Sequence, residues 1–152
     1  MEIAISKYFN TRQNIIVPNL SYGFLDHEAD LFIIKKNGYG VEVEIKRSRT
    51  DFLKDFKKEH RHLDSDNRIR EYYYAFPETI IDSCINKVPE EWGILKVMKV
   101  LDYDKNESVV LCRLIRTAKP LKNARKLTTD EQLKIARLGV LRVWKLKEKL
   151  LR

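Results

Sequence analysis

Several features are scarce in this sequence of 152 residues, and each scarcity narrows the possibilities. There are only two cysteines, Cys84 and Cys112, without metal-ligand spacing, so we expect a reducing compartment and neither a disulfide scaffold nor a zinc ribbon. Uninterrupted apolar runs are only a few residues long, so no segment is expected to span a membrane. The N-terminus, MEIAISKYFN, lacks the basic-then-apolar pattern of a secretory signal. We therefore expect a cytoplasmic protein with no membrane partner.

Repeats, low-complexity stretches and evident linkers are absent as well, which predicts a single domain over residues 1–152. The hydrophobic fraction of 43% is typical of a globular chain and argues against disorder. A chain of this length is large enough to bury a core without stabilising disulfides or metals.

Positive charge is concentrated at one end of the chain. Residues 113–152 hold 13 of the 30 Lys and Arg residues and 3 of the 22 Asp and Glu residues, a net charge of +10, whereas the preceding residues carry −2. We predict a basic, mainly helical extension that suits a polyanion such as nucleic acid. The alternative is a solvated helix face that only aids solubility.

The apolar pattern predicts an α/β domain with a mixed central β-sheet flanked by helices in the order α-β-β-β-α-β, plus a strand pair and a C-terminal helix. A tight turn at 37–40 joins strands at 28–36 and 41–47. A helix from about 51 to 61, with Thr50 as its N-cap, is followed by a strand at 71–76, a connection long enough for a parallel crossover. The remaining elements are a helix at 2–11, a strand at 13–18 closed by Pro18, a loop at 19–27, a helix at 79–86, strands at 93–101 and 107–116, and a helix starting near Thr129.

Charged residues alternate along the strand at 41–47. Val41, Val43 and Ile45 share one face, while the other face carries Glu42, Glu44 and Lys46. The tight turn pairs this strand with the one that holds Glu28 and Asp30, so Asp30 is expected to face Glu44 and Lys46. Three or four carboxylates and one lysine then converge on one patch of the sheet.

Such a patch favours a divalent cation. Opposed carboxylates repel, and Mg²⁺ relieves the repulsion because it binds carboxylate oxygens, water and phosphate oxygens. The chemistry that this implies is phosphodiester hydrolysis, in which Lys46 orients the attacking water or stabilises charge on the phosphate. The alternative is a solvent-exposed hairpin with mixed charges.

The spacing of Asp30 and Glu44-Ile45-Lys46, followed by a helix, resembles the PD-(D/E)XK nuclease superfamily. That resemblance implies a restriction-endonuclease-like core in which Asp30, Glu44 and the main-chain carbonyl of Ile45 bind Mg²⁺, with Mn²⁺ as a substitute, and Lys46 activates water. Glu28 and Glu42 are surplus acids that could ligate a second metal. No proline precedes Asp30, which is a departure from the motif.

A narrower likeness covers residues 15–101. The runs HEADLFII, VEVEIKRSRTDFLKD, EYYYAFP and WGILKV are similar to MmcB-like DNA-repair nucleases and related small phage and prophage nucleases, in which a Ser-x-x-Asp-Phe helix start follows the motif; here these residues are Ser48, Asp51 and Phe52. The likeness implies a role in DNA repair, recombination or phage DNA processing.

We therefore interpret the chain as a Mg²⁺-dependent DNA nuclease, either an endonuclease or an exonuclease, that can form a homodimer. The alternative is a non-catalytic DNA-binding or interaction module that keeps the nuclease fold. His27, His60 and His62 are interpreted as surface or capping residues, Asp51 and Asp55 as helix-surface charges, and the tyrosines at 72–74 as packing residues. Residues expected to contact DNA are Arg47, Arg49, Arg142, Lys145, Lys147 and Lys149.

Overall fold

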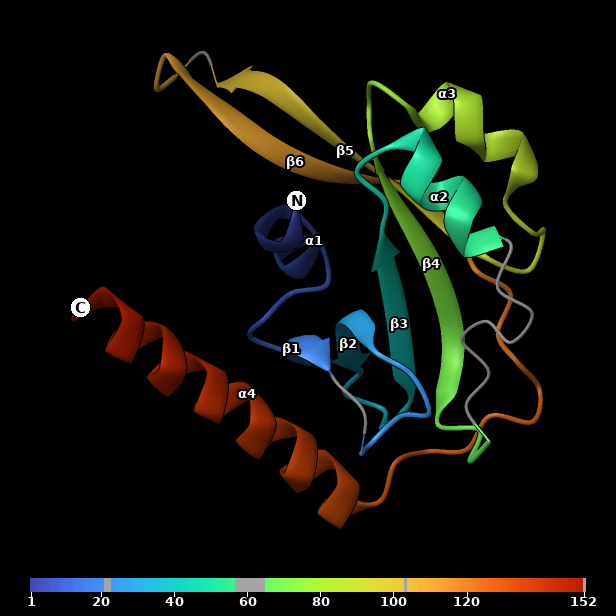
Figure 1. The fold of residues 1–152 in the computed structure, drawn as a ribbon, viewed down its shortest axis with the longest axis vertical. Coiled ribbons are helices and arrows are strands. Elements are labelled where there is room, and N and C mark those ends of the chain that lie inside the picture. Colours follow the sequence, from blue (N-terminus) through green and yellow to red (C-terminus); the bar gives the residue numbers. More distant parts are fainter. Residues whose placement is uncertain (21–22, 57–64, 103, 152) are drawn as a thin grey trace.

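The computed structural model describes residues 1–20, 23–56, 65–102 and 104–151. Within them the chain forms an α/β fold with a six-stranded mixed sheet and four α-helices (Figure 1). The helices are α1 (Glu2–Tyr8), α2 (Arg49–Phe56), α3 (Ile81–Cys84) and α4 (Thr129–Leu150), with a 3-10 turn, η1 (Ile85–Lys87). The strands are β1 (Ile15–Leu20), β2 (Ala29–Ile34), β3 (Gly40–Ile45), β4 (Ile69–Pro77), β5 (Gly93–Asp102) and β6 (Glu107–Arg116).

The strands lie in the sheet in chain order, from β1 to β6. Antiparallel pairing joins β1 to β2, β2 to β3 and β5 to β6, whereas β3, β4 and β5 run parallel. The predicted fold class and the predicted α-β-β-β-α-β order are confirmed, including the parallel crossover from β3 through α2 to β4. No helix in the described part of the chain is long and apolar enough to cross a membrane.

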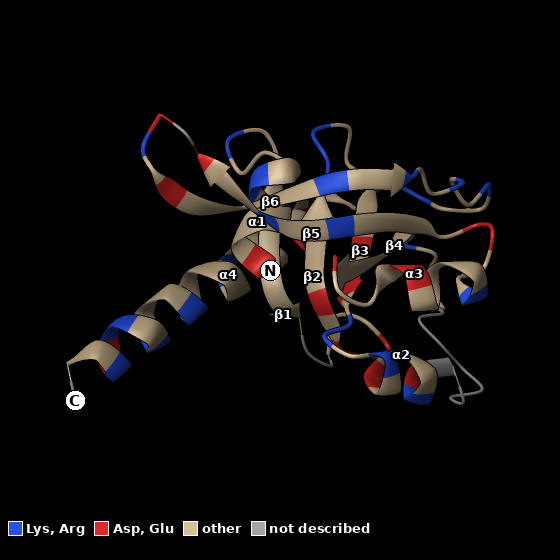
Figure 2. Ribbon diagram, turned by 90° about the horizontal axis from the view of Figure 1, so that it is seen from above, with Lys and Arg blue, Asp and Glu red and all other residues tan. Residues whose placement is uncertain are grey.

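Helices cover both faces of the sheet (Figure 2). Ala4, Ile5 and Phe9 pack from the α1 side on one face, against a cluster that includes Val41, Val43 and Ile45 of β3. Phe52 of α2 and Ile81 of α3 pack on the opposite face against Tyr74 and Phe76. The charged residues of β3 alternate with Val41, Val43 and Ile45, so they lie on the α2 side of the sheet.

Two glycines are required by the backbone where strands meet. Gly38 has φ +86° in the predicted turn between β2 and β3, a conformation that other residues rarely adopt. Gly93 begins β5 directly beside Tyr73, and a Cβ atom there would overlap the Tyr73 ring. The turn and the parallel β4–β5 pairing therefore both depend on the absence of a side chain.

Several predicted element ends were wrong. Pro18 does not close the first strand: β1 continues to Leu20 across part of the predicted loop, because β1 is an edge strand, where a missing N–H is tolerated. The N-cap of α2 is Ser48 rather than Thr50, since the Asp51 N–H donates to Ser48 Oγ over 3.1 Å. Likewise α4 is capped by Thr128 and not by Thr129.

The predicted helices also differ in length from those observed. The helix expected at 2–11 ends at Tyr8, and the segment expected as one helix at 79–86 divides into α3 and η1. The predicted helix over 51–61 is described only as far as Phe56, and His60 and His62 lie outside the described residues.

Candidate active site

The predicted charged residues of β3 are buried, although charged residues that alternate along a strand normally face water. The exposed fractions are 0% for Glu42, 5% for Glu44 and 6% for Lys46. The alternative of a solvent-exposed hairpin is therefore wrong. Burying charge costs free energy unless the groups are paired or bound, so this patch must contain specific interactions.

Asp30 lies where β3 ends, on the neighbouring strand. The β2–β3 register pairs Leu31 with Val43, which sets Asp30 opposite Glu44 on the same face. Its Oδ2 atom accepts a hydrogen bond of 2.7 Å from the Ile45 N–H. The carboxylate of Asp30 is thereby held against the main chain of the Glu44-Ile45-Lys46 motif.

Burial raises the pKa of Asp30 above its usual value, even though the Ile45 N–H and the charge of Lys46 both favour the ionised form. Asp51 and Glu2 add to the increase through their negative charges. A nearby cation would favour the ionised form of Asp30, and Mg²⁺ is one that carboxylates bind.

Lys46 is placed between two carboxylates that come from different elements. Its Nζ atom lies 3.1 Å from Glu44 Oε2 on β3 and 3.3 Å from Asp55 Oδ2 on α2. Burial by itself would lower the pKa of Lys46, but the charges of Glu44 and Asp55 raise it above the usual value. Lys46 is therefore protonated at neutral pH and acts as a donor, not as a base.

Asp55 is held from the opposite side by Tyr74, whose hydroxyl donates to Asp55 Oδ2 over 2.8 Å. The interpretation of Asp55 as a helix-surface charge was wrong, because only 4% of the residue is exposed. Asp55 follows Phe52 by three residues, so the two share one helix face. Because Phe52 is the apolar residue that docks α2 on the sheet, this spacing could have identified Asp55 as buried.

Glu42 has a partner of its own. The Nε2 atom of His27 lies 2.8 Å from both carboxylate oxygens of Glu42. The interpretation of His27 as a surface or capping residue was therefore incomplete, since its ring binds a carboxylate that is fully buried. Glu28, the other surplus acid, is exposed just before β2.

The donor set for a metal is small. Among the residues that the structure describes, no group of three or more His, Cys, Asp and Glu side chains is arranged to hold a metal ion. The predicted set consists of two carboxylates, Asp30 and Glu44, and the Ile45 carbonyl. Oxygen donors of this kind fit Mg²⁺, which typically binds through one or two carboxylates and keeps several waters.

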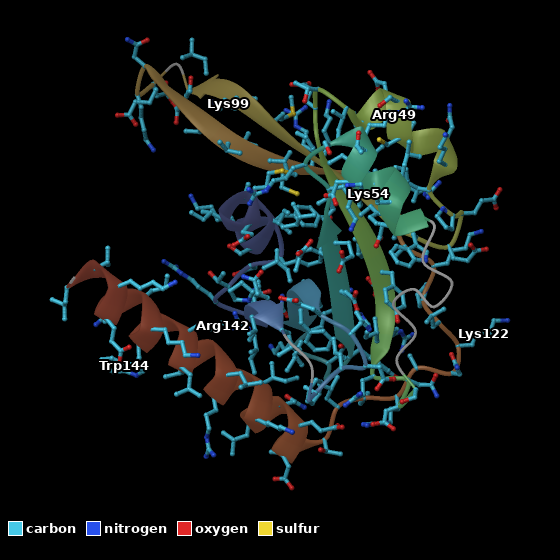
Figure 3. The ribbon with its side chains drawn as sticks, in the orientation of Figure 1. Arg49, Lys54, Lys99, Lys122, Arg142 and Trp144 are labelled. Atoms are coloured by element: carbon cyan, nitrogen blue, oxygen red, sulfur yellow. The ribbon has the colours of Figure 1, made fainter. Side chains whose placement is uncertain are left out.

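The predicted DNA-contacting residues fall into separate groups. Arg47 and Arg49 are exposed at the start of α2, next to the motif. Arg142 reaches from α4 to the main-chain carbonyl of Asn19 on β1 (Figure 3). It lines a pocket of about 330 Å³ together with Lys145, Lys149, Glu2, Pro18, Asn19 and Leu146.

Lys147 stands apart from this basic pocket. Its Nζ atom lies 5.1 Å from the ring centre of Trp144, and Lys147 is not among the residues that line the pocket. Since Glu2 lines the pocket and also influences the pKa of Asp30, the pocket extends toward the carboxylates of the candidate site.

Comparison with known proteins supports the fold alone. No family model and no curated protein matches the chain. A solved structure described as "SPO1766 protein of unknown function from Silicibacter pomeroyi" matches with a TM-score of 0.60 at 16% sequence identity. The match covers 97% of this chain and 86% of that chain, so nearly the whole described architecture occurs in another protein.

Proposed function

We propose that this protein is a Mg²⁺-dependent DNA nuclease of the PD-(D/E)XK type that hydrolyses phosphodiester bonds. The observation that carries the proposal is the meeting of Asp30, Glu44 and Lys46 at the end of β3, on one face of the sheet. The burial of Glu44 and Lys46 adds support, because paired charges that serve only solubility would face water.

In this proposal Asp30, Glu44 and the Ile45 carbonyl hold the metal. In a strand, the N–H and C=O of one residue point to the same side, and the Ile45 N–H points toward Asp30. The metal, when bound, polarises a phosphoryl oxygen and lowers the pKa of a bound water. The resemblance implies products with 5′-phosphate and 3′-hydroxyl ends.

Lys46 then supplies a fixed positive charge. Because it stays protonated, it orients the attacking water through an N–H donor and stabilises the negative charge that develops on phosphate. Asp55 is a positioning residue: it holds the Lys46 ammonium from the α2 side while Tyr74 holds Asp55. Rigid support of this kind keeps a catalytic donor aimed at the reacting atoms.

The basic pocket on α4 supports a role in binding DNA. Arg142, Lys145 and Lys149 offset the negative charge of the site, which would otherwise repel a polyanion. Arg47 and Arg49 provide further cations on the side of the motif. We also propose that the enzyme acts in the cytoplasm.

A cleavage assay tests the function directly. Duplex, nicked, branched and single-stranded DNA would be incubated with the purified chain in Mg²⁺, in Mn²⁺ and in chelator, alongside a Glu44→Gln variant. We expect wild type to cut at least one substrate with metal, and neither chelated wild type nor the variant to cut. Metal-independent or absent cleavage would reject the proposal, and DNA binding without cleavage would favour the non-catalytic module.

A further inference from the structure

The helix α4 is attached to the rest of the chain by a small part of its surface. Of its 22 residues, only Ile135 is buried, and Gly139 lies close to Val17 of β1. The C-terminal half projects away from the sheet (Figures 1 and 2). Because most helices of globular proteins owe their stability to packing of an apolar face, a projecting helix of this length calls for a partner.

A second, unused apolar side runs along α4. The exposed fractions are 59% for Leu133, 55% for Val140, 51% for Val143 and 86% for Leu150. Trp144 borders this side, is 57% exposed, and points away from the sheet in Figure 3. The amphipathic helix was expected to dock this side on the core or on a partner chain, and the structure shows that it does not enter the core.

The spacing of this side is that of a helix–helix seam. The seam residues alternate at intervals of three and four along the whole helix, and they are Leu133, Ala136, Val140, Val143, Lys147 and Leu150. Apolar residues at such intervals pack one helix against another in coiled coils. The contact with β1 uses other positions, so the seam is accessible while α4 stays attached.

We propose that α4 pairs antiparallel with α4 of a second copy of this chain, forming a homodimer with two-fold symmetry. In one register every seam position finds a suitable counterpart on the second copy. Leu133 faces Leu150, Val140 faces Val143, and Lys147 faces Ala136, whose small side chain leaves room for the lysine. The same contacts are repeated on both sides of the axis, as a two-fold interface requires.

Charge favours this antiparallel arrangement. The first turn of α4 carries Asp130 and Glu131, while the last turns carry Lys145, Lys147 and Lys149. Antiparallel pairing places the acidic end of each helix beside the basic end of the other and opposes the helix dipoles favourably. Parallel pairing would instead bring like charges together. The helix is thus complementary to itself, which identifies a second copy as its partner.

Lys147 gives the seam its selectivity. A single lysine among apolar seam residues lowers the stability of a coiled coil but specifies its register and oligomeric state. It also explains why Lys147 lies apart from the basic pocket: its neighbours on the helix surface are seam residues.

Two adjacent substitutions test the seam. Val140→Glu places a charge at the centre of the seam, whereas Leu141→Glu adds the same charge one residue away, at a leucine that is 50% exposed outside the seam. Sedimentation equilibrium of the full chain over a wide range of concentrations, without DNA or metal, measures the association. We expect wild type and Leu141→Glu to dimerise, and Val140→Glu to associate roughly a hundredfold more weakly.

Replacement of the seam lysine provides an independent test. Lys147→Leu removes the polar residue from the seam and should tighten association by roughly tenfold. Circular dichroism confirms that each variant keeps its helical content. A wild-type chain that stays monomeric, equal effects of the two glutamates, or weaker association of Lys147→Leu would each overturn the proposal. No readout here depends on DNA cleavage.

Discussion

Lys46 is the residue at which the chemistry of the site and the stability of the fold meet. It joins β3 to α2 by contacting both Glu44 and Asp55 in a nearly water-free environment. Removing one member of a buried ion pair is costly, because the remaining charge loses its partner without regaining water. The same cation that would act on phosphate therefore helps to hold α2 on the sheet.

We expect Lys46→Met to lower cleavage by about 10²–10³-fold, the usual effect of losing one preorganised donor. Unfolding of the metal-free protein should become easier by about 3 kcal/mol, because the carboxylates that contact Lys46 then repel each other. Cleavage rates and urea unfolding measure the two effects. Lys54→Met, on the exposed side of α2, is the matched control and should change neither. A Lys46→Met enzyme that cuts at the wild-type rate would contradict the catalytic role.

Asp30 should behave in the opposite way and cost stability. Its raised pKa means that the folded chain holds this proton to a higher pH than the unfolded chain does. Stability is therefore lost as the pH rises from the ordinary carboxyl pKa through the raised one. Above that range the ionised Asp30 is a burden on the metal-free fold.

Asp30→Asn keeps an acceptor for the Ile45 N–H but carries no charge. We expect the variant to be more stable than wild type at neutral pH without metal, and equal to it below about pH 4. Mg²⁺ should stabilise wild type and not the variant, and the variant should not cut DNA. Thermal unfolding at several pH values, with and without Mg²⁺, checks this. A less stable variant at neutral pH would show that burial is not the dominant influence on Asp30.

At the scale of elements, the start of α4 is fixed by a reciprocal cap. Thr128 Oγ1 accepts from the Glu131 N–H, and the Glu131 carboxylate accepts from the Thr128 N–H over 2.8 Å. Arg125 donates to both carboxylate oxygens of Glu131. These hydrogen bonds, with Arg125 first among them, lower the pKa of Glu131 to about 2.

We expect Thr128→Ala to lower the free energy of unfolding by about 1 kcal/mol, the usual cost of losing a helix cap. Glu131→Gln should lower stability at neutral pH, where the wild-type carboxylate is ionised. Because the folded pKa is depressed, this contribution is present above the ordinary carboxyl pKa and disappears as the pH falls toward 2. Unfolding curves at neutral and acidic pH measure the difference, and a gap between Glu131→Gln and wild type that stayed constant with pH would contradict it.

Strands could be predicted closely because their information is local. The alternation in β3 and the Asn37-Gly38 turn identify a hairpin without knowledge of the rest of the chain. Element ends were harder, because they depend on which hydroxyl accepts a hydrogen bond, as at Ser48 and Thr128. Pro18 was misread for another reason: whether a strand tolerates proline depends on its place at the sheet edge, which only the folded topology reveals.

At the scale of the whole molecule, α4 divides its charged and apolar residues between two surfaces. Arg142, Lys145 and Lys149 line the pocket near Asn19, whereas Lys147 lies in the seam. The sequence shows a basic helix but not which lysines share a side with the candidate site. That division depends on how α4 docks on β1, and the docking is set by Ile135 and Gly139, not by the charges.

This division predicts a contrast in DNA binding. For duplex DNA, log K falls with log salt by about 0.9 for each phosphate that is neutralised. Changing Arg142, Lys145 and Lys149 together to Gln should flatten the slope by up to about 2.7 and weaken all sequences alike. Lys147→Gln, the matched control, should leave the slope unchanged. Affinities measured at several salt concentrations decide the matter, and equal slopes for the triple variant and wild type would exclude the pocket from DNA binding.

The two tryptophans of this chain make it observable by its own fluorescence. Trp92 stacks between Tyr72 and Tyr74, with ring centres 4.9 and 4.7 Å away, and Tyr74 binds Asp55 beside Lys46. Trp144 stands in solvent next to the seam. Trp92 should emit at shorter wavelength and resist quenching by iodide, whereas Trp144 should emit at longer wavelength and be quenched. Light emitted by one residue thus reports on the candidate active site, and light emitted by the other reports on the surface where two copies would meet.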